Sequence, residues 1–197
     1  MPSPDGPIGR RVVVVGTTSS GKSTLGARLS KTLGVPFVEL DALNWEPNWH
    51  SVAEHDPAEF ERRIREATEG DGWVVAGSYS KFSERTFWPR LETVVWLDLP
   101  LRLVLWRVVT RSWRRWRTKE LLWGTNTENL WTHLKLWSPD SLIYWAVTTH
   151  RVKRRRYLAQ MTDPAWAHIR YIRLTTPAEV EAFARAVEAG TASATEA

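Results

Sequence analysis

The chain has 197 residues, 43% of them hydrophobic and 25% charged, which is the length and balance of one globular domain with its own core. The absence of cysteine excludes disulfides and thiolate metal sites, and it agrees with a reducing cytoplasm as the location. No apolar run approaches the ~20 residues that a membrane-spanning helix needs. Residues 1–9 are rich in Pro and Gly and lack an apolar core, so we expect a flexible N-terminus rather than a signal peptide.

The net charge of +5 is unevenly distributed along the chain. Residues 101–160 contain 13 Lys and Arg and 3 Asp and Glu, a balance of +10, which leaves −5 for the rest. A basic half of this kind attracts phosphate groups, nucleic acid or an anionic membrane. Charge alone does not choose among these partners.

The first regular elements follow the flexible start. Residues 12–15 are four valines, which predict a strand buried on both faces, as in the interior of a parallel sheet. After a polar loop, Leu25, Leu29 and Leu33 recur at helical spacing, and Gly34 is expected to end that helix.

Strands and helices then alternate to the end of the chain. Further strands are expected at residues 35–40, 72–76, 93–99 and 168–174. Helices are expected to begin at Asp56, near Leu101, at Asp140 and at Thr176, where Glu179 completes a capping box. This alternation predicts an α/β three-layer sandwich in which helices cover both faces of a parallel five-stranded sheet. We place a single domain at residues 10–189 and a disordered tail at residues 190–197.

The polar loop after the first strand has the sequence GTTSSGKST and fits the pattern G-x-x-x-x-G-K-S of a phosphate-binding P-loop. The glycines allow consecutive backbone N–H groups to surround a phosphate, and the helix that follows adds its positive N-terminus. Lys22 would bridge the outer phosphates, and the Ser23 hydroxyl would ligate magnesium. We therefore predict that ATP and Mg²⁺ bind at Gly16, Thr17, Thr18, Ser19, Ser20, Gly21, Lys22, Ser23 and Thr24.

Two observations exclude other classes of P-loop protein. The chain is too short for the added modules of a motor or transporter ATPase. It also lacks an Asn-Lys-x-Asp guanine signature, which argues against a GTPase switch. A small-molecule kinase is the remaining P-loop class that the sequence favours.

Five segments of the chain resemble the adenylate kinase-like group of P-loop nucleotide kinases. Within that group they are most similar to small bacterial proteins labelled DNA topology modulation protein or adenylate kinase-related. The segments are GTTSSGKST, VELDALNWEPNW (38–49), WVVAGSYSK (73–81), VVWLDLPLRLVLWRVVTR (94–111) and RLTTPAEVEAF (173–183). The resemblance covers most of residues 10–185. It implies transfer of the γ-phosphoryl group of Mg-ATP to a nucleotide or a related metabolite.

Glu39 and Asp41 end the second expected strand, where ligands gather in open α/β sheets. In the similar shikimate-type and gluconate-type kinases, an acidic pair stands at this position. One residue of the pair contacts magnesium through a water molecule, and the other contacts the acceptor. By this resemblance Asp41 is the first candidate for the acceptor side or the metal, with a turn cap as the alternative. Trp45 and Trp49 would wall the acceptor or pack structurally.

The third strand departs from the pattern of the group. Similar proteins have Asp-Gly where this chain has Ala76-Gly77, so either Asp41 carries the acidic role alone or turnover is weak. Asp98 imitates a Walker B aspartate, but the matching segment of nucleotide kinases is mainly structural, and we expect the same here.

The basic half supplies candidates for phosphate contacts. Arg107, Arg111 and Arg114 are spaced to share one helix face. The resemblance implies that Arg107 and Arg111 match the Arg-x-x-x-Arg pair that leads into the lid of adenylate kinases and contacts adenine and phosphate. A guanidinium suits that role because it is always charged, planar and bidentate. A solvated basic face is the alternative explanation of the same spacing.

Residues 112–137, which mix Arg and Trp without a clean period, would form a helical lid that excludes water on closing. The lack of cysteine rules out a zinc-stapled lid. His133 lies in this segment, and a lone histidine is more often structural than catalytic. Beyond the lid, residues 151–156 form a second basic cluster, in which Arg151 is the candidate for a phosphate contact.

Arg interleaved with Trp also suits DNA or RNA, which would make the chain a nucleotide-dependent regulator with little turnover. Ala76 favours that alternative. Membrane binding is disfavoured because apolar and basic residues do not separate into clean faces. The leading prediction is a kinase with a small-molecule phosphate acceptor, and neither the acceptor's identity nor the oligomeric state follows from these residues.

Overall fold

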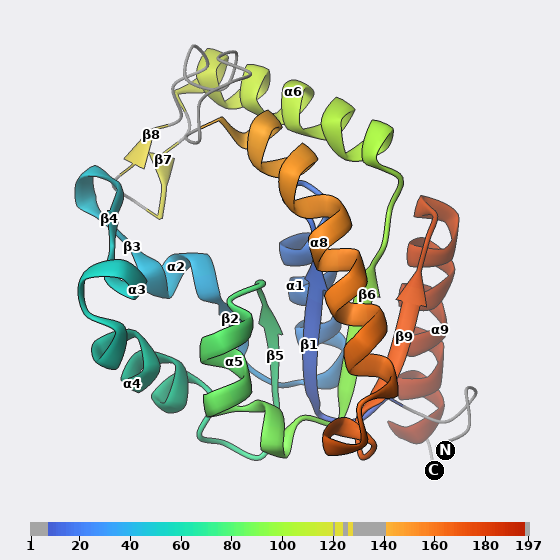
Figure 1. Cartoon of the computed structure of the whole chain (residues 1–197). Helices are drawn as coiled ribbons and strands as arrows, with labels where there is room; N and C mark the ends of the chain where they lie inside the picture. The colour runs from blue at the N-terminus through green and yellow to red at the C-terminus, as the bar shows by residue number, and fades with distance from the viewer. Residues whose placement is uncertain (1–7, 120, 124–125, 128–140, 196–197) are drawn as a thin grey trace.

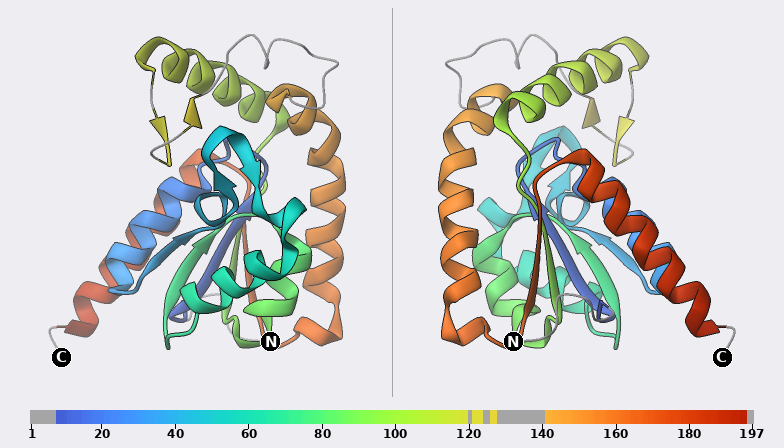
Figure 2. Two further views of the ribbon diagram at one scale, coloured as in Figure 1. Left: turned by 90° about the vertical axis from the view of Figure 1, so that its left-hand side faces the viewer. Right: turned by 90° about the vertical axis from the view of Figure 1, so that its right-hand side faces the viewer.

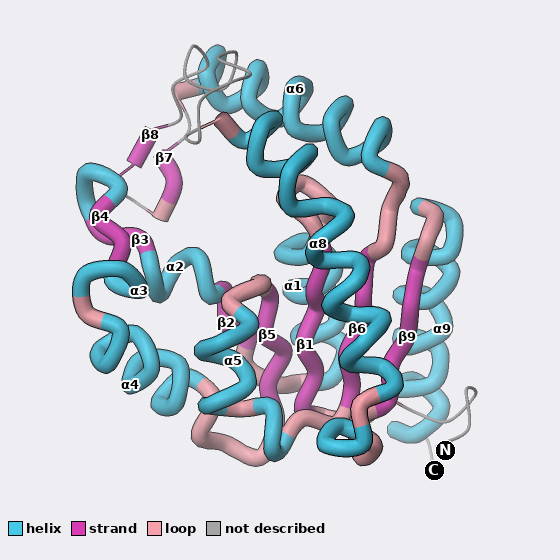
Figure 3. The backbone as a smooth tube through the Cα atoms, in the orientation of Figure 1, coloured by secondary structure: helices cyan, strands magenta, loops and turns pink. Residues whose placement is uncertain are grey.

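The computed structural model describes residues 8–119, 121–123, 126–127 and 141–195, and Figure 1 shows their arrangement. The centre of the molecule is a sheet of five strands, all parallel, in the order β2-β5-β1-β6-β9. These strands are β1 (Arg11–Gly16), β2 (Phe37–Glu39), β5 (Trp73–Ala76), β6 (Thr93–Leu97) and β9 (Arg170–Leu174). Figure 3 shows them side by side, with β1 in the middle. The predicted parallel five-stranded sheet is confirmed.

Helices cover both faces of this sheet, as predicted. On one face lie α1 (Lys22–Leu33) and α9 (Pro177–Thr195), and on the other lie α4 (Pro57–Ala67), α5 (Ser80–Thr86) and α8 (Leu142–Thr162). Figure 2 shows the three layers edge-on, with α6 (Leu101–Thr118) crossing above the carboxyl ends of the strands. No described helix has the length and apolar character needed to span a membrane.

The alternation of side chains along β1 divides the core in two. Val13 and Val15 point into a cluster with Phe60 of α4 and Tyr157 of α8. Val12 and Val14 point to the other face, into the cluster formed with α1 and α9. Because successive residues of a strand face opposite sides, a run of four valines satisfies both layers at once. The central strand is therefore fixed rigidly beneath the loop that follows it.

The helix boundaries that depend on local signals are confirmed. The Asp56 side chain accepts a hydrogen bond from the Glu59 backbone N–H at 3.0 Å and caps α4. The Thr176 hydroxyl accepts one from the Glu179 N–H at 3.1 Å and caps α9. Gly34 ends α1 with a left-handed φ of 62°. These are short-range interactions that the sequence alone specifies.

Several elements differ from the expectation. The strand expected at 35–40 ends at Glu39, where the short helix α2 (Leu40–Asn44) begins, and α5 was not expected at all. Residues 112–118, which were expected in the lid, continue α6, and α9 extends to Thr195, beyond the expected end of the domain.

The smaller elements connect these parts. They are β3 (Trp45–Glu46), η1 (Pro47–Trp49), β4 (His50–Ser51), α3 (Val52–His55), η2 (Trp88–Arg90), β7 (Leu121–Leu122), β8 (Asn126–Thr127) and η3 (Pro164–Trp166). β3 pairs with β4, and β7 pairs with β8, each antiparallel. Of the expected lid at 112–137, residues 128–137, including His133, lie outside the described residues.

Candidate functional site

The loop between β1 and α1 has the curled backbone that a phosphate cradle needs. Gly16 has a φ of 152°, and a Cβ there would lie 2.8 Å from both the Leu97 carbonyl oxygen and the Ser20 Oγ. Gly21 has a left-handed φ of 99° and is the N-cap of α1. A side chain at either position would strain the turn. The glycines thus place the loop directly over the N-terminus of α1, where an anion is favoured.

Lys22 begins α1 and folds back over the loop. Its Nζ donates a hydrogen bond to the Thr17 carbonyl oxygen at 2.9 Å. Burial lowers the pKa of Lys22 to about 8, and the positive charge of Lys153 contributes next, while Asp41 opposes the shift. A lysine held in this way binds an anion strongly, because the anion replaces the solvation that burial has removed.

The two acidic residues after β2 have separate partners. The Ser23 hydroxyl donates a short hydrogen bond to Glu39 Oε1, and the Trp123 Nε1–H donates to Glu39 Oε2 at 3.4 Å. Asp41 instead accepts a hydrogen bond from the Tyr79 hydroxyl at 2.8 Å. A hydroxyl and a carboxylate side by side are hard oxygen ligands of the kind that Mg²⁺ takes alongside phosphates and waters. Ser23 with Glu39 therefore fits magnesium better than the predicted pairing of Ser23 with Asp41.

Tyr79 is a site residue that the sequence analysis missed. Burial raises the pKa of its hydroxyl, and the negative charge of Asp41 raises it further. The phenol consequently stays protonated and remains a donor to Asp41 across the physiological pH range. This hydrogen bond fixes the orientation of the Asp41 carboxylate at the edge of the site.

Ser78 follows the strand that lacks the acid expected from similar proteins. Ala76 ends β5 and is buried, and the next polar side chain, Ser78, donates to the Gly16 carbonyl oxygen at 3.0 Å. The segment after β5 therefore supports the P-loop and Asp41 through two hydroxyls, those of Ser78 and Tyr79. In the sequence, these two hydroxyls appear only as a Ser-Tyr pair after a glycine, which matches no recognised motif.

The two predicted arginines of α6 lie toward the P-loop. Arg107 Nη1 donates to the Ser20 carbonyl oxygen at 3.0 Å. The charge of Arg111, one turn further along α6, is among the causes that lower the pKa of Lys22. Arg107 thus contacts the loop that Lys22 covers, and the charge of Arg111 acts on Lys22. Their roles in catalysis and nucleotide binding stay predictions.

Asp98 has a different environment from the P-loop acids. Its side chain is 5% exposed, and its Oδ2 accepts from Arg173 Nε at 2.9 Å and forms an ion pair with Arg154 Nε at 3.3 Å. These partners tie β6 to β9 and α8. The placement agrees with the structural role expected for this residue, since both arginines neutralise it.

Three tryptophans gather beside Glu39. The ring centroids of Trp45 and Trp49 are 5.6 Å apart, and those of Trp49 and Trp123 are 5.9 Å apart, each pair edge to face. Asn126 of β8 joins the same group: its Oδ1 accepts from the Trp49 N–H and its Nδ2 donates to the Glu46 carbonyl oxygen, both at 3.0 Å. The hairpin of β7 and β8 is thereby held against η1, over the acidic side of the site.

The basic cluster of α8 contributes Lys153 rather than the predicted Arg151. Arg151 is exposed, whereas Lys153 is half-buried. Burial lowers the pKa of Lys153, and Asp41 opposes the shift. The sequence pattern carried a signal that was missed: Lys153 lies four residues before the fully buried Tyr157 and so shares its helix face.

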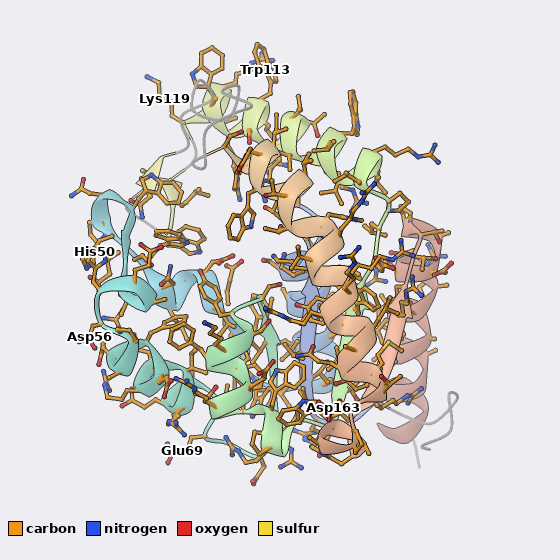
Figure 4. The ribbon with its side chains drawn as sticks, in the orientation of Figure 1. His50, Asp56, Glu69, Trp113, Lys119 and Asp163 are labelled. Carbon is orange, nitrogen blue, oxygen red and sulfur yellow. The ribbon has the colours of Figure 1, made fainter. Side chains whose placement is uncertain are left out.

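The far end of α6 is exposed. Trp113 and Trp116 are 53% and 42% exposed, and Figure 4 shows Trp113 and Lys119 directed away from the sheet. These side chains therefore do not line the site around Lys22.

A parallel sheet with a Gly-Lys-Ser loop between its central strand and α1 defines the P-loop kinase fold. Two solved structures are similar to it. Shikimate kinase from Bacteroides thetaiotaomicron has a TM-score of 0.50 and 18% identity, and the match covers 91% of this chain and 96% of that one. Deoxyadenosine kinase from M. mycoides has a TM-score of 0.51 and 12% identity, and the match covers 90% of this chain and 98% of that one. At these identities the likeness concerns the fold alone.

The sequence comparison is more specific. The model of the shikimate kinase family matches residues 18–160, well over half of the chain, so the chain belongs to the shikimate kinase family. A shikimate kinase from Paramagnetospirillum magneticum is 32% identical over 120 residues, which are 55% of this chain and 62% of that protein. The chain spans less than two thirds of the curated relatives it matches. The predicted kinase family is thus confirmed at the coarse level, but it is the shikimate kinase family and not the DNA topology modulation group.

Proposed function

We propose that this protein is an ATP-dependent kinase that transfers the γ-phosphoryl group of Mg-ATP to a small acceptor held beside Asp41. The observation that carries the proposal is Lys22, a half-buried cation whose Nζ donates to the Thr17 carbonyl oxygen of the P-loop and whose charge environment includes Asp41, Glu39 and Arg111. A phosphate-binding loop, a metal-compatible pair and a carboxylate for an acceptor all meet around this one side chain. That combination is what phosphoryl transfer requires.

Each group has a role that its contacts support. The P-loop amides and Lys22 would hold the β- and γ-phosphates, and Ser23 with Glu39 would hold Mg²⁺, which neutralises the charge on those phosphates. Arg107 and Arg111 would stabilise the charge that spreads over the transferred group. Positioning and charge neutralisation of this kind account for most of the rate of such reactions.

Asp41 would orient an acceptor hydroxyl. In the transfer, the acceptor oxygen forms a bond to the γ-phosphorus, the bond from that phosphorus to the β–γ bridging oxygen breaks, and its electron pair leaves with ADP. The hydroxyl proton passes to Asp41, whose carboxylate is already oriented by Tyr79. Trp45 and Trp49 would form an apolar wall on the same side.

Family membership makes shikimate the first acceptor to test. The experiment measures phosphate transfer from labelled Mg-ATP to shikimate, gluconate, deoxynucleosides and nucleoside monophosphates, with Lys22→Met as the inactive control. Transfer to one acceptor that is lost in Lys22→Met supports the proposal and names the substrate. Binding of ATP without transfer to any acceptor would refute it.

One surface favours a second candidate function, nucleic-acid binding by a nucleotide-dependent regulator. The outer face of α6 exposes Trp106, Trp113 and Trp116 at 67%, 53% and 42%, and the helix sequence contains no Asp or Glu. Exposed aromatic rings among arginines suit stacking on unpaired bases. Titration of labelled single-stranded DNA across a salt series tests this candidate. Affinity that falls steeply with salt and is lost in Trp113→Ala supports it, whereas no binding at low salt excludes it.

A further inference from the structure

The β7–β8 hairpin is anchored beside η1, and Figure 1 shows it beyond the end of α6. Leu122 of β7 and Asn126 of β8 are buried, at 6% and 3% exposed. The Asn126 Oδ1 accepts from the Trp49 N–H and its Nδ2 donates to the Glu46 carbonyl oxygen, both at 3.0 Å. A buried amide that uses both its donor and its acceptor in this way is satisfied in one orientation only. The contact between the hairpin and η1 is therefore specific.

Three residues of this contact have a left-handed backbone. The φ angles are 62° at Asn48, 59° at Trp49 and 47° at Trp123. Residues other than glycine seldom adopt this region, bulky ones least of all, and they stay in it only where the surrounding structure determines their conformation. Trp49 and Trp123 are also the two rings that meet edge to face at 5.9 Å. Both sides of the contact are thus built at a cost in backbone energy, which indicates a role beyond the packing of two rings.

The hairpin reaches the acidic side of the site through the indole of Trp123. Its Nε1–H donates to Glu39 Oε2 at 3.4 Å, while the Ser23 hydroxyl donates to Glu39 Oε1. No Lys or Arg among the described residues forms an ion pair with Glu39. Each oxygen of this carboxylate is thus held by one side chain, Ser23 of the P-loop for the first and Trp123 of the hairpin for the second.

A tryptophan at position 123 can do what another aromatic residue cannot. Phe would supply a ring for the edge-to-face contact with Trp49, but only the indole adds an N–H, which donates and never accepts. A glutamate side chain has three rotatable torsions, and a bond to one oxygen limits where the other lies. Carboxylates that ligate metals are themselves held by such outer hydrogen bonds, and loss of the outer partner weakens metal binding. The Trp123 N–H therefore keeps Glu39 Oε1 beside Ser23.

We propose that Trp123 is a positioning residue that holds the Glu39 carboxylate in the orientation in which it ligates Mg²⁺ together with Ser23. This inference rests on the proposed kinase function, which assigns Mg²⁺ to that pair. Because the same hydrogen bond joins the hairpin to the metal ligand, Mg²⁺ binding and hairpin docking strengthen each other by the same factor. The docked hairpin is thus the state that the loaded metal site favours.

The first test measures how much Mg²⁺ strengthens nucleotide binding. Calorimetry gives the dissociation constant of ADP with EDTA and with saturating Mg²⁺, and the ratio of the first to the second is the metal's contribution. We expect Trp123→Phe to lower that ratio about 10-fold and to leave the EDTA value unchanged, since a ring is kept and the N–H to Glu39 is lost. Trp49→Phe is the matched control, because it alters the same ring pair without removing the bond to Glu39, and it should keep the wild-type ratio. In Glu39→Gln, where the charged acceptor is already lost, adding Trp123→Phe should lower the ratio little further.

Hydrogen exchange measures the same coupling from the side of the hairpin. The Trp49 amide donates to Asn126 while the hairpin is docked, so the protection of this amide reports docking. In wild type, Mg-ADP should slow its exchange about 10-fold relative to ADP in EDTA, as reciprocity requires. In Trp123→Phe the metal should no longer change the exchange rate.

Four outcomes would overturn the inference. They are an unchanged ratio in Trp123→Phe, the same loss in Trp49→Phe, an equal loss of ADP affinity with and without Mg²⁺, and a wild type whose ADP affinity does not respond to Mg²⁺. Circular dichroism and thermal unfolding establish that each variant folds, and Trp123→Leu replaces Trp123→Phe if the latter does not. Neither readout needs an acceptor or turnover. Absence of transfer to every acceptor would therefore refute the proposed function and leave this test intact, whereas an active kinase with an unchanged ratio would refute this inference alone.

Discussion

The burial of Lys22 predicts an unusual dependence of stability on pH. In the unfolded chain its pKa is the ordinary 10.5, and in the folded chain it is about 8. Below about pH 8 both states carry the charge, so folding bears the full cost of burying it. Between the two pKa values the folded chain releases the proton while the unfolded chain keeps it, and the unfolding free energy therefore rises with pH. Replacement by Met removes this dependence.

The magnitude follows from the two pKa values. From about pH 7 to about pH 9.5, a lysine with these values adds about 2 kcal/mol to the unfolding free energy of wild type relative to Lys22→Met. Since the Lys22 side chain retains partial solvent access, we expect about 1–2 kcal/mol. Groups that do not interact with Lys22 titrate alike in both proteins and cancel from the difference, whereas the charge of Lys153 acts on Lys22 and contributes to it.

The assay is urea unfolding of wild type and Lys22→Met at several pH values over that range. The quantity to compare is the difference between the two unfolding free energies, not either value alone. A difference that moves in favour of wild type with rising pH agrees with a buried, charged Lys22. A difference that is flat, or that moves in favour of Lys22→Met, would refute the reasoning, because the lysine would then be solvated in the folded protein.

Three further predictions concern the hydrogen bonds of the site. Glu39→Gln should raise the Mg²⁺ concentration for half-maximal transfer at least about 10-fold, and an unchanged Mg²⁺ titration would contradict the placement of the metal. Tyr79→Phe removes the 2.8 Å hydrogen bond to Asp41 and should lower kcat/KM for the acceptor about 10-fold. The affinity for ATP, measured by calorimetry, should stay the same, and a loss of that affinity would argue against a role of Tyr79 in acceptor binding. Asn126→Ala removes both 3.0 Å bonds that hold the hairpin and should weaken its docking by about 1–3 kcal/mol. Hydrogen exchange at the Trp49 amide measures this, and unchanged protection would show that the rings alone hold the hairpin.

Features set by neighbouring residues could be predicted from the sequence. The four valines, the P-loop glycines and the caps at Asp56 and Thr176 depend on interactions within a few residues, and the structure has each of them. The order of elements also predicted the parallel sheet, because successive strand–helix–strand units favour right-handed crossovers between parallel strands. Together these features suffice to place Lys22 at the start of a helix, behind the central strand of the sheet.

Features set by distant residues could not be predicted. Ser78 and Tyr79 have their roles because Gly16 and Asp41 lie opposite them, which only the packed sheet brings about. In the same way, Lys153 is half-buried and Arg151 is exposed because distant contacts of α8, such as those of His150 with Leu99 and Gln160 with Glu84, decide which side of the helix packs inward. A run of basic residues shows that a helix is charged, but it does not show which of its side chains faces inward.

The division of Glu39 and Asp41 is an intermediate case. Both were singled out as an acidic pair, but their separate contacts follow from the end of β2 at Glu39 and the start of α2 at Leu40. The change from strand to helix turns the two side chains in different directions, toward Ser23 and Tyr79. The sequence predicted a strand at 35–40, which continues past this boundary. It therefore did not predict that Glu39 and Asp41 would have different hydrogen-bond partners.

The edge-to-face contact of Trp49 with Trp123, at 5.9 Å, joins the hairpin to the acidic side of the site through two chromophores. Indole transitions at such a separation couple electronically, so the near-ultraviolet circular dichroism contains a contribution that exists only while the hairpin is docked. The protein thus carries its own optical reporter of hairpin docking. Nucleotide titrations can follow that docking in real time without any label, and Trp123→Phe supplies the silent reference.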